Sequence, residues 1–181
     1  ILMELAERDW EKEVNNRAYF YNYYTENELM NILDQIINTC ALLQKNHISH
    51  RDIKPQNILY LNGKYILSDF GEAKILEGNG KIMQRIRGTE MYMSPILFYG
   101  LNKGINTKDK ITHNTYKSDV YSLGMCALFA ATLNLDCPCE IRELKDMDDV
   151  EKILKNFLSD KYSLNFISFV LEMLEIDEDL R

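Results

Sequence analysis

The chain has 181 residues, of which 46% are hydrophobic and 27% charged, and it carries a formal net charge of −7. This length predicts one domain with a buried core, and this composition excludes a disordered or fibrous protein. The acidic balance argues against general nucleic-acid binding. Many acidic residues lie in the last quarter of the chain, where we expect a solvated face rather than a site for a basic partner.

No stretch approaches the roughly 20 consecutive apolar residues that cross a bilayer, so we expect no membrane segment. The chain opens at Ile1 without an initiator methionine or a basic leader, which predicts a piece of a longer polypeptide. Four cysteines indicate reduced thiols in an intracellular, cytoplasmic compartment: Cys40, Cys126, Cys137 and Cys139. The Cys137-Pro138-Cys139 segment lacks a second Cys/His pair elsewhere, so we predict no metal site there.

The first elements in chain order are a strand and two helices. Residues 1–5 resemble the end of a buried strand, and residues 10–16 begin a short helix. A second helix follows Thr25 and Glu28, which have the spacing of a capping box, and Asn46 is its expected stop. Its apolar residues recur at helical spacing and form one broad stripe: Leu29, Ile32, Leu33, Ile36, Ile37, Cys40 and Leu43.

A tight β-hairpin is predicted next. Residues 59–61 and 65–67 are apolar, β-favouring runs, and Asn62-Gly63 between them is a strong signal for a two-residue turn. The hairpin folds the chain back, so we expect Asn57 and Asp69 to lie side by side at its open end. An amide oxygen and a carboxylate placed in this way suit Mg²⁺ on the phosphates of a nucleotide.

The second half of the chain alternates loops with helices. Residues 72–87 have the composition of a polar loop, and residues 99–116, rich in Gly, Asn, Thr and Lys, of an inserted loop. Residues 119–133 predict a central helix, since its continuation from Met125 to Leu133 is apolar nearly all round. Amphipathic helices are expected near 150–158 and 165–174. The predicted fold is mainly α, of the α+β class, with one small β-hairpin.

Four motifs occur together in one order. They are His-Arg-Asp-Ile-Lys-Pro-Gln-Asn at 50–57, Asp-Phe-Gly at 69–71, Gly-Thr-Glu-Met-Tyr-Met-Ser-Pro at 88–95, and Ser-Asp-Val-Tyr-Ser-Leu-Gly at 118–124. The first two resemble the catalytic loop and the metal loop of eukaryotic-type protein kinases. The whole set follows the order and nearly the spacing of that family.

The resemblance implies a division of the chain. Residues 1–9 would end the last strand of the N-terminal lobe and form the hinge, and residues 10–181 would form the C-terminal lobe. Within that lobe, residues 72–95 would be the activation and substrate loop. The glycine-rich loop, the strand lysine and the helix glutamate of the family have no counterpart in this chain, so we expect the N-terminal lobe upstream.

The resemblance also implies a role for each residue of the motifs. Asp52 would orient the attacking hydroxyl and accept its proton, and Lys54 would offset charge on the transferring phosphoryl group. Asn57 and Asp69 would hold the Mg²⁺ ions that accompany ATP. Thr89 would bond both Asp52 and Lys54, which is typical of serine/threonine-specific enzymes.

Other residues would bind the nucleotide or support the loops. By the same resemblance, ATP would meet the gatekeeper Met3, the hinge from Glu4 to Ala6, and Leu59 on the hairpin. His50 is expected to be structural and to stack on Phe70. The carboxylate of Asp119 is expected to accept hydrogen bonds from the backbone around His50 and Arg51, again as a structural group.

Two departures from the family pattern concern the activation and substrate loop. Ile96 stands where the family has a glutamate, so we expect Arg181 to find another acid or to stay solvated. Between Gly71 and Gly88 there is no Ser, Thr or Tyr. We therefore expect no phosphorylation switch in that stretch, with Glu77 or an acid from a partner serving Arg51 instead.

The function that the resemblance implies is phosphoryl transfer from MgATP to serine or threonine of protein substrates, within a larger kinase domain. One alternative is a pseudokinase or scaffold that keeps the fold to bind partners, although Asp52, Asn57 and Asp69 all stand. A second alternative, a small-molecule phosphotransferase, is disfavoured by the motif at 88–95. Without the upstream lobe, we expect the 181 residues alone to be inactive.

Overall fold

The computed structural model describes residues 4–103 and 110–181. Its helices are α1 (Trp10–Tyr19), α2 (Glu26–Lys45), α3 (Pro95–Asn102), α4 (Thr115–Thr132), α5 (Asp136–Glu143), α6 (Met147–Leu158) and α7 (Leu164–Met173). Its strands are β1 (Arg8–Asp9), β2 (Ile48–Ser49), β3 (Ile58–Leu61), β4 (Lys64–Leu67), β5 (Lys74–Ile75), β6 (Lys81–Arg85) and β7 (Lys110–Asn114). The strands form small antiparallel sheets in the orders β1-β3-β4, β2-β5 and β6-β7. The fold is therefore mainly helical, as predicted.

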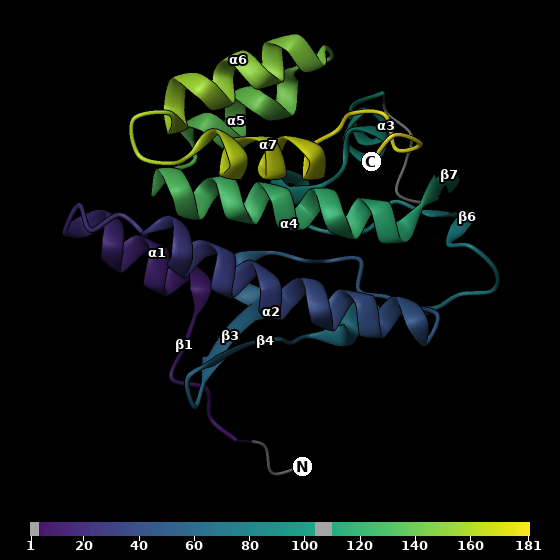
Figure 1. The fold of residues 1–181 in the computed structure, drawn as a ribbon. Helices are drawn as coiled ribbons and strands as arrows, with labels where there is room; N and C mark the ends of the chain where they lie inside the picture. The colour runs from purple at the N-terminus through teal and green to yellow at the C-terminus, as the bar shows by residue number, and fades with distance from the viewer. Residues whose placement is uncertain (1–3, 104–109) are drawn as a thin grey trace.

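Helix α4 occupies the centre of the molecule. Figure 1 shows it between α2 on one side and α5, α6 and α7 on the other. Nearly every side chain from Leu123 to Leu133 is buried, because this stretch is apolar on all sides. The helix begins four residues before the predicted start, where the Asn114 side chain accepts hydrogen bonds from the backbone N–H groups of Tyr116 and Lys117. This central helix is the framework for the loops described below.

Helix α2 forms as the sequence predicts. The Thr25 hydroxyl accepts from the Glu28 backbone N–H at 3.2 Å, and the Glu28 carboxylate accepts from the Thr25 N–H at 2.7 Å. This confirms the capping box, which contributes about 1 kcal/mol. The buried part of its stripe is Leu29, Ile32, Leu33 and Ile36. The helix ends at Asn46, again as predicted, and leads the chain towards residues 50–57.

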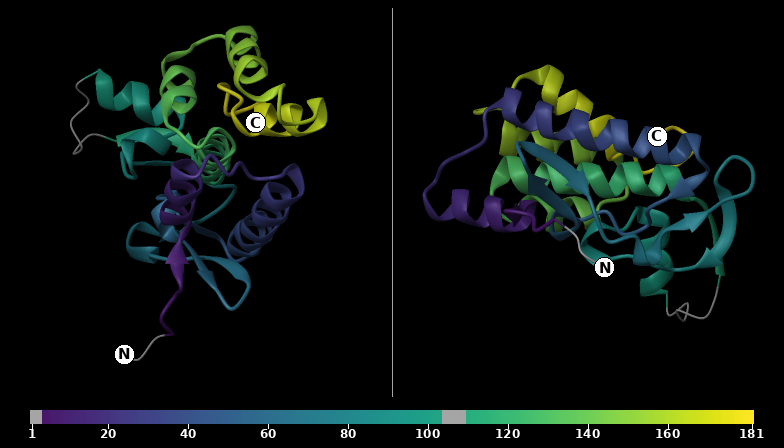
Figure 2. Two further views of the ribbon diagram at one scale, coloured as in Figure 1. Left: turned by 90° about the vertical axis from the view of Figure 1, so that its left-hand side faces the viewer. Right: turned by 90° about the horizontal axis from the view of Figure 1, so that it is seen from below.

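The β3–β4 hairpin is also confirmed. Asn62 and Gly63 both have positive φ, at 50° and 80°, which a two-residue hairpin turn requires. Ile58 pairs with Leu67, and just beyond that pair the Ser68 N–H donates to the Asn57 carbonyl at 2.8 Å. Asn57 and the residues around Asp69 are therefore brought to the same open end. Seen from below in Figure 2, the hairpin lies across the underside of the helices.

The two predicted loops contain regular structure, and this part of the prediction is wrong. Strand β6 lies inside 72–87, while α3 and β7 take up both ends of 99–116, with 104–109 outside the described residues. Strands β6 and β7 pair over five residues. The sequence did not predict this pairing, because polar Gln84 and His113 lie on the buried face of the β6–β7 ribbon. The two strands therefore lack the alternation of apolar and polar residues that is typical of a half-buried strand. Helix α5 was also not predicted.

The N-terminal strand differs from expectation as well. Residues 1–3, which include Met3, lie outside the described residues. Glu4 and Leu5 are not in a strand, and Leu5 is 92% exposed instead of buried. Regular pairing begins only at β1, where Arg8 faces Tyr60 on β3. In the described structure, Glu4 and Leu5 do not pair with another strand, and the Leu5 side chain is not packed in a core.

Arg181 makes no ion pair with an acid among the described residues, and it is half-buried rather than fully solvated. Its guanidinium donates to the backbone carbonyls of Glu175 and Lys117, each at 2.8 Å, and lies 4.9 Å from the centre of the Tyr121 ring. Burial lowers the pKa of Arg181 to about 10. The arginine therefore ties the end of the chain to α4 without the glutamate that Ile96 replaces.

Within the described residues, no helix is long and apolar enough to cross a bilayer. The same residues contain no group of three or more His, Cys, Asp or Glu side chains placed to hold a metal ion. All four cysteines are free thiols.

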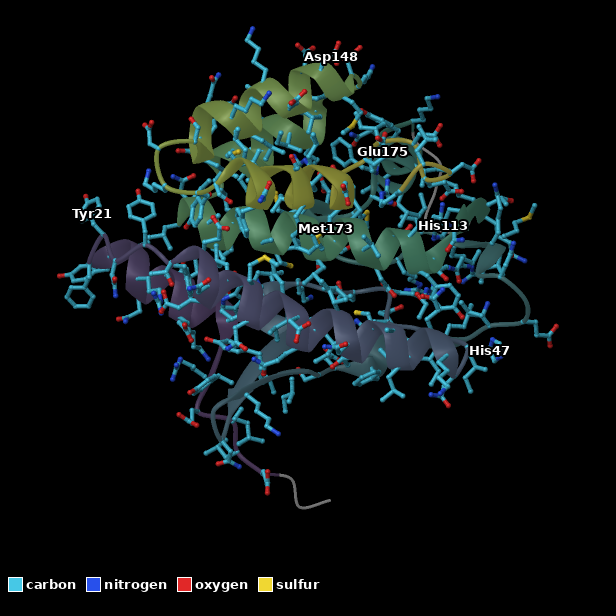
Figure 3. The ribbon with its side chains drawn as sticks, viewed as in Figure 1. Tyr21, His47, His113, Asp148, Met173 and Glu175 are labelled. Atoms are coloured by element: carbon cyan, nitrogen blue, oxygen red, sulfur yellow. The ribbon has the colours of Figure 1, made fainter. Side chains whose placement is uncertain are left out.

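The end of α1 carries an unusual residue. Asn22 N–H donates to the Arg17 carbonyl at 2.9 Å and Tyr21 N–H to the Ala18 carbonyl at 3.1 Å, the bonds of a Schellman motif. Tyr21 holds the position that usually favours glycine, with φ at 51° and its ring 82% exposed. Figure 3 shows Tyr21 at the outer tip of the molecule.

We expect Tyr21→Gly to raise the free energy of unfolding by about 0.5–1 kcal/mol, because glycine adopts positive φ without a Cβ clash. Urea denaturation measures this change. The matched control is Tyr19→Gly, at a helical position that is also exposed, where the same substitution should destabilise by a few tenths of a kcal/mol or more, at most about 1. If both variants changed the free energy of unfolding in the same direction, the inference of backbone strain at Tyr21 would be contradicted.

Candidate active site

The loop at 50–57 is attached to the core through one buried carboxylate. Asp119, on α4, accepts from the Ser49 hydroxyl at 2.7 Å and from the backbone N–H groups of His50 and Arg51, each at 2.8 Å. Burial raises the pKa of Asp119, and the three hydrogen bonds oppose that rise. Arg51 has a positive φ of 72°, a conformation that these bonds help to hold. The contacts expected for Asp119 are therefore present.

His50 joins this loop to the Asp-Phe-Gly loop. The imidazole is fully buried, and its ring lies edge-on to Phe70 with the centroids 5.0 Å apart. Its Nε2 atom lies 2.9 Å from the carbonyl oxygen of Ser68. Both contacts are structural, which agrees with the role expected for His50.

Asp52, Lys54 and Thr89 form one connected cluster. The Thr89 hydroxyl donates to one oxygen of Asp52 at 2.8 Å, and the ammonium of Lys54 lies 2.8 Å from the other oxygen. Lys54 also donates to the Thr89 hydroxyl at 2.9 Å. Gly88, with φ at 108°, allows this approach, because a Cβ there would lie 2.9 Å from the Arg51 carbonyl oxygen. The cluster thus brings together residues 35 and 37 positions apart.

The electrostatics of the cluster keep Asp52 ionised. Burial acts to raise the pKa of Asp52, but the hydrogen bonds and charge of Lys54, with the Thr89 hydroxyl, outweigh it and hold the pKa below its usual value. A lowered folded-state pKa stabilises the fold above the unfolded pKa of about 4, and this contribution is lost as pH falls through the folded-state value. At neutral pH the carboxylate is therefore charged and able to accept a proton.

Asn57 offers an oxygen atom next to this cluster, and Asp69 offers its carboxylate at the open end of the hairpin. The Asn57 amide nitrogen donates to the Asp52 carbonyl at 2.9 Å and to its carboxylate at 3.2 Å, so the amide oxygen remains available as a ligand. Asp69 is exposed, and one of its oxygens accepts from the Gly71 N–H at 3.2 Å. An amide oxygen and a carboxylate are hard donors of the kind Mg²⁺ takes when phosphates complete its coordination. The donor set therefore fits magnesium with a nucleotide.

The residues expected to meet the nucleotide are not brought together in the described structure. Leu59 faces Asp9 in the β1–β3 pairing, and the Glu7 N–H donates to the Tyr60 carbonyl at 3.0 Å. In this antiparallel register, the chain before Arg8 runs away from Leu59 towards the hairpin turn. Ala6 is half-buried and Glu4 is exposed, and Met3 lies outside the described residues.

Sequence reasoning missed several supporting residues. Ser68 bonds the Asn57 carbonyl through both its N–H and its hydroxyl, at 2.8 and 2.9 Å, and so closes the open end of the hairpin. Gln56 donates its amide to Glu11 on α1. Ser68 could have been found from the hairpin register, because a turn at Asn62-Gly63 places it next to Asn57. The Gln56–Glu11 contact has no local signal.

A cleft of about 450 Å³ opens beside the cluster. Asp52, Lys54 and Thr89 line it together with the charged residues Glu72, Arg87 and Glu90 and the apolar residues Ile86, Met93 and Leu101. The lining therefore mixes charged and apolar groups next to Asp52.

A family model described as the protein kinase domain matches residues 1–181. The chain therefore belongs to the protein kinase family.

The relatives that it resembles are named as kinases. Serine/threonine-protein kinase cds1 of Schizosaccharomyces pombe is 31% identical over 168 residues, which cover 86% of this chain and 34% of the relative. Probable serine/threonine-protein kinase nek3 of Dictyostelium discoideum is 32% identical over 185 residues, covering 98% of this chain and 15% of the relative. The chain thus spans about a third or less of the length of these relatives.

We expect Asp119→Asn to lower the free energy of unfolding by about 3 kcal/mol, because the new amide would leave buried donors of the 50–57 loop without an acceptor. Denaturant titration measures the change. Asp34→Asn, at an exposed position on α2, is the matched control and should change stability by less than about 0.5 kcal/mol. Similar values for the two variants would refute the anchoring role of Asp119.

Proposed function

We propose that this chain is the hinge and C-terminal lobe of a serine/threonine protein kinase, which transfers a phosphoryl group from MgATP to a hydroxyl of a protein substrate. The observation that carries the proposal is the cluster of Asp52, Lys54 and Thr89 at mutual distances of 2.8–2.9 Å. This places a charged base, a cation and a hydroxyl around one point at the edge of the substrate cleft.

Each residue of the cluster has a distinct role in this proposal. Asp52, ionised at neutral pH, would orient the acceptor hydroxyl and take its proton as the oxygen attacks. Lys54 would neutralise charge that grows on the transferring group. Thr89 would hold Asp52 and Lys54 at a constant separation. Phosphoryl transfer depends mostly on positioning and charge, so these groups suffice for the share of this lobe.

The metal would be held by Asn57 and Asp69. The free amide oxygen of Asn57 and the exposed carboxylate of Asp69 supply hard ligands, and the phosphates of ATP would supply others. Bound Mg²⁺ neutralises phosphate charge and aligns the phosphates for transfer. The bond from the Asn57 amide nitrogen to Asp52 couples the position of the metal ligand to that of the base.

Serine or threonine in a protein is the proposed acceptor. The contact between Lys54 and Thr89 supports this, since it is the pairing that the serine/threonine resemblance implies. The cleft beside the cluster, lined by Ile86, Met93 and Leu101 as well as by charged residues, offers room for a peptide next to Asp52. The names of the related kinases agree with this acceptor class.

The nucleotide site would be completed from outside this chain. In this proposal residues 1–9 contain the hinge, with Met3, Glu4, Ala6 and Leu59 near the adenine, and residues 10–181 form the C-terminal lobe. The glycine-rich loop and the strand lysine would belong to a lobe upstream. An intracellular location fits the four free thiols.

A pseudokinase or scaffold is the alternative, and the Ile96 departure favours it. That argument is weaker because the N–H groups of Arg181 are hydrogen-bonded to backbone carbonyls without the missing glutamate. Asp52, Asn57 and Asp69 are also intact, which a scaffold does not require.

The first test of the proposal is Asp52→Asn in the full-length protein. We expect phosphate transfer to a serine-containing protein substrate to fall at least about 100-fold, because the base is lost while its shape is kept. Circular dichroism should show an unchanged fold. Transfer at the parent rate would show that Asp52 is not the base and would favour the scaffold.

The second test uses residues 1–181 alone. We expect this piece to bind ATP poorly and to transfer no phosphate, because half of the proposed nucleotide cleft lies elsewhere. Isothermal titration with MgATP and a radiolabelled transfer assay measure both quantities. Robust transfer by the piece alone would contradict the need for an upstream lobe.

A further inference from the structure

We propose that strand β7 holds residues 81–89 of the activation and substrate loop in place, as a built-in substitute for a phosphate on that loop. In many kinases, phosphorylation orders this segment by adding a charge that arginine can bind. Here the inference rests on the proposed function, and it assigns to Ile111 and His113 the role of positioning residues that act through Thr89.

The β6–β7 ribbon has two unlike faces. Five residue pairs run from Lys81–Asn114 to Arg85–Lys110. The outward side chains are largely exposed: Lys81, Met83, Arg85, Lys110 and Thr112. The inward side chains are buried or half-buried: Ile82, Gln84, Ile111 and His113. This alternation marks a ribbon that packs on the protein through one face and is not a free loop.

Strand β7 is anchored to the core of the protein because it continues directly into α4. Asn114 ends the strand and caps the helix. The next residue, Thr115, donates its N–H to the Gly80 carbonyl at 3.1 Å, which closes the ribbon at the start of β6. Lys81 also lies 3.8 Å from the Glu178 carboxylate and 3.6 Å from that of Asp179. The start of β6 is thus tied to the central helix and to the end of the chain.

The inner face of the ribbon fits two neighbouring elements. Ile111 packs against α3 at Gly100, where any Cβ would collide with its Cδ1 atom. Gln84 and His113 are only 5% and 3% exposed, and they line a small cavity of about 20 Å³ together with Arg51 and Asp119. That volume is enough for one water molecule. Figure 3 shows His113 where strand β7 meets the start of α4.

The cavity has an unusual polar character. Both polar atoms of the Gln84 amide and the Nδ1 atom of His113 are buried without a protein partner among the described residues. Burial lowers the pKa of His113, so the imidazole is neutral at neutral pH and does not repel Arg51. The inner face of the β6–β7 ribbon therefore places polar groups next to the 50–57 loop. It adds no further positive charge beside Arg51.

The ribbon controls the cluster because the chain between them is short. Only Ile86 and Arg87 separate the end of β6 from Gly88, which lies against the backbone of Arg51, and Thr89 bonds Asp52 directly. A shift of β6 would therefore move Thr89 off Asp52 and Lys54. Misplacing a catalytic contact by about 1 Å can reduce the rate on the order of 100-fold.

Arg51 is already engaged without a phosphate. Its guanidinium donates to the Glu72 carbonyl at 3.2 Å, and the Glu72 carboxylate lies 3.5 Å from Arg87. Arg51 therefore binds a backbone carbonyl rather than a carboxylate, and the expected contact with Glu77 does not occur among the described residues. Residues 72–87 contain no Ser, Thr or Tyr, so this part of the loop carries no acceptor for a phosphate.

The test compares both faces of β7 in the full-length protein. Ile111→Ala removes the side chain at Gly100, Ile111→Val is the conservative variant, and Thr112→Ala alters the outward face as a matched control. Hydrogen exchange read by mass spectrometry measures protection of residues 81–89 and of α4. Transfer assays measure kcat and the KM for ATP.

We expect Ile111→Ala to lose protection at 81–89 but not in α4, and to lower kcat roughly tenfold with an unchanged KM for ATP. Ile111→Val and Thr112→Ala should behave as the parent protein. Phosphatase treatment should leave the parent rate unchanged. Unchanged protection at 81–89 in Ile111→Ala, or activity lost on phosphatase treatment through a phosphosite that orders this segment, would overturn the inference.

The two proposals can fail separately. Exchange at 81–89 does not depend on catalysis, so it reports on β7 even if the parent protein transfers no phosphate. Absence of transfer in the parent protein contradicts the proposed function. Normal transfer with unchanged exchange in Ile111→Ala contradicts only the role of β7.

Discussion

The arrangement of the site depends on a buried carboxylate at the start of the central helix. Asp119 is only 6% exposed, and it binds three donors from residues 49–51. A carboxylate in such surroundings is stable only if its hydrogen bonds are made, so the loop must adopt the conformation that offers those donors. The position of Asp52, and through it Lys54 and Asn57, follows from this constraint.

Helix α4 positions the other half of the site as well. Its start continues from β7, which pairs with β6, and β6 leads within a few residues to Thr89. Asp52 and the Thr89 hydroxyl that bonds it are therefore both attached to α4, along two separate routes. Figure 2, seen from below, shows the ribbon at the end of the molecule away from α1. Such double attachment limits the relative movement of Asp52 and Thr89.

Local signals were reliable where short-range chemistry decides the structure. The capping box at Thr25, the stripe of α2 and the turn at Asn62-Gly63 each depend on residues within a few positions, and all three formed as predicted. The β6–β7 ribbon was missed because its partners are 25 to 33 residues apart and because polar Gln84 and His113 stand beside Ile82 and Ile111 on its inner face. The partner of Arg181 was missed for a related reason, since backbone carbonyls carry no sequence signature.

The sequence by itself determined the family and the identity of the candidate site residues, because four spaced motifs rarely coincide and the chemistry of phosphoryl transfer needs those side chains. It also determined that residues 72–87 lack a phosphate acceptor. Only the tertiary structure decided what holds that segment instead. Contacts such as Ile111 against Gly100 and Arg51 against the Glu72 carbonyl arise from packing between distant segments, and no local pattern encodes them.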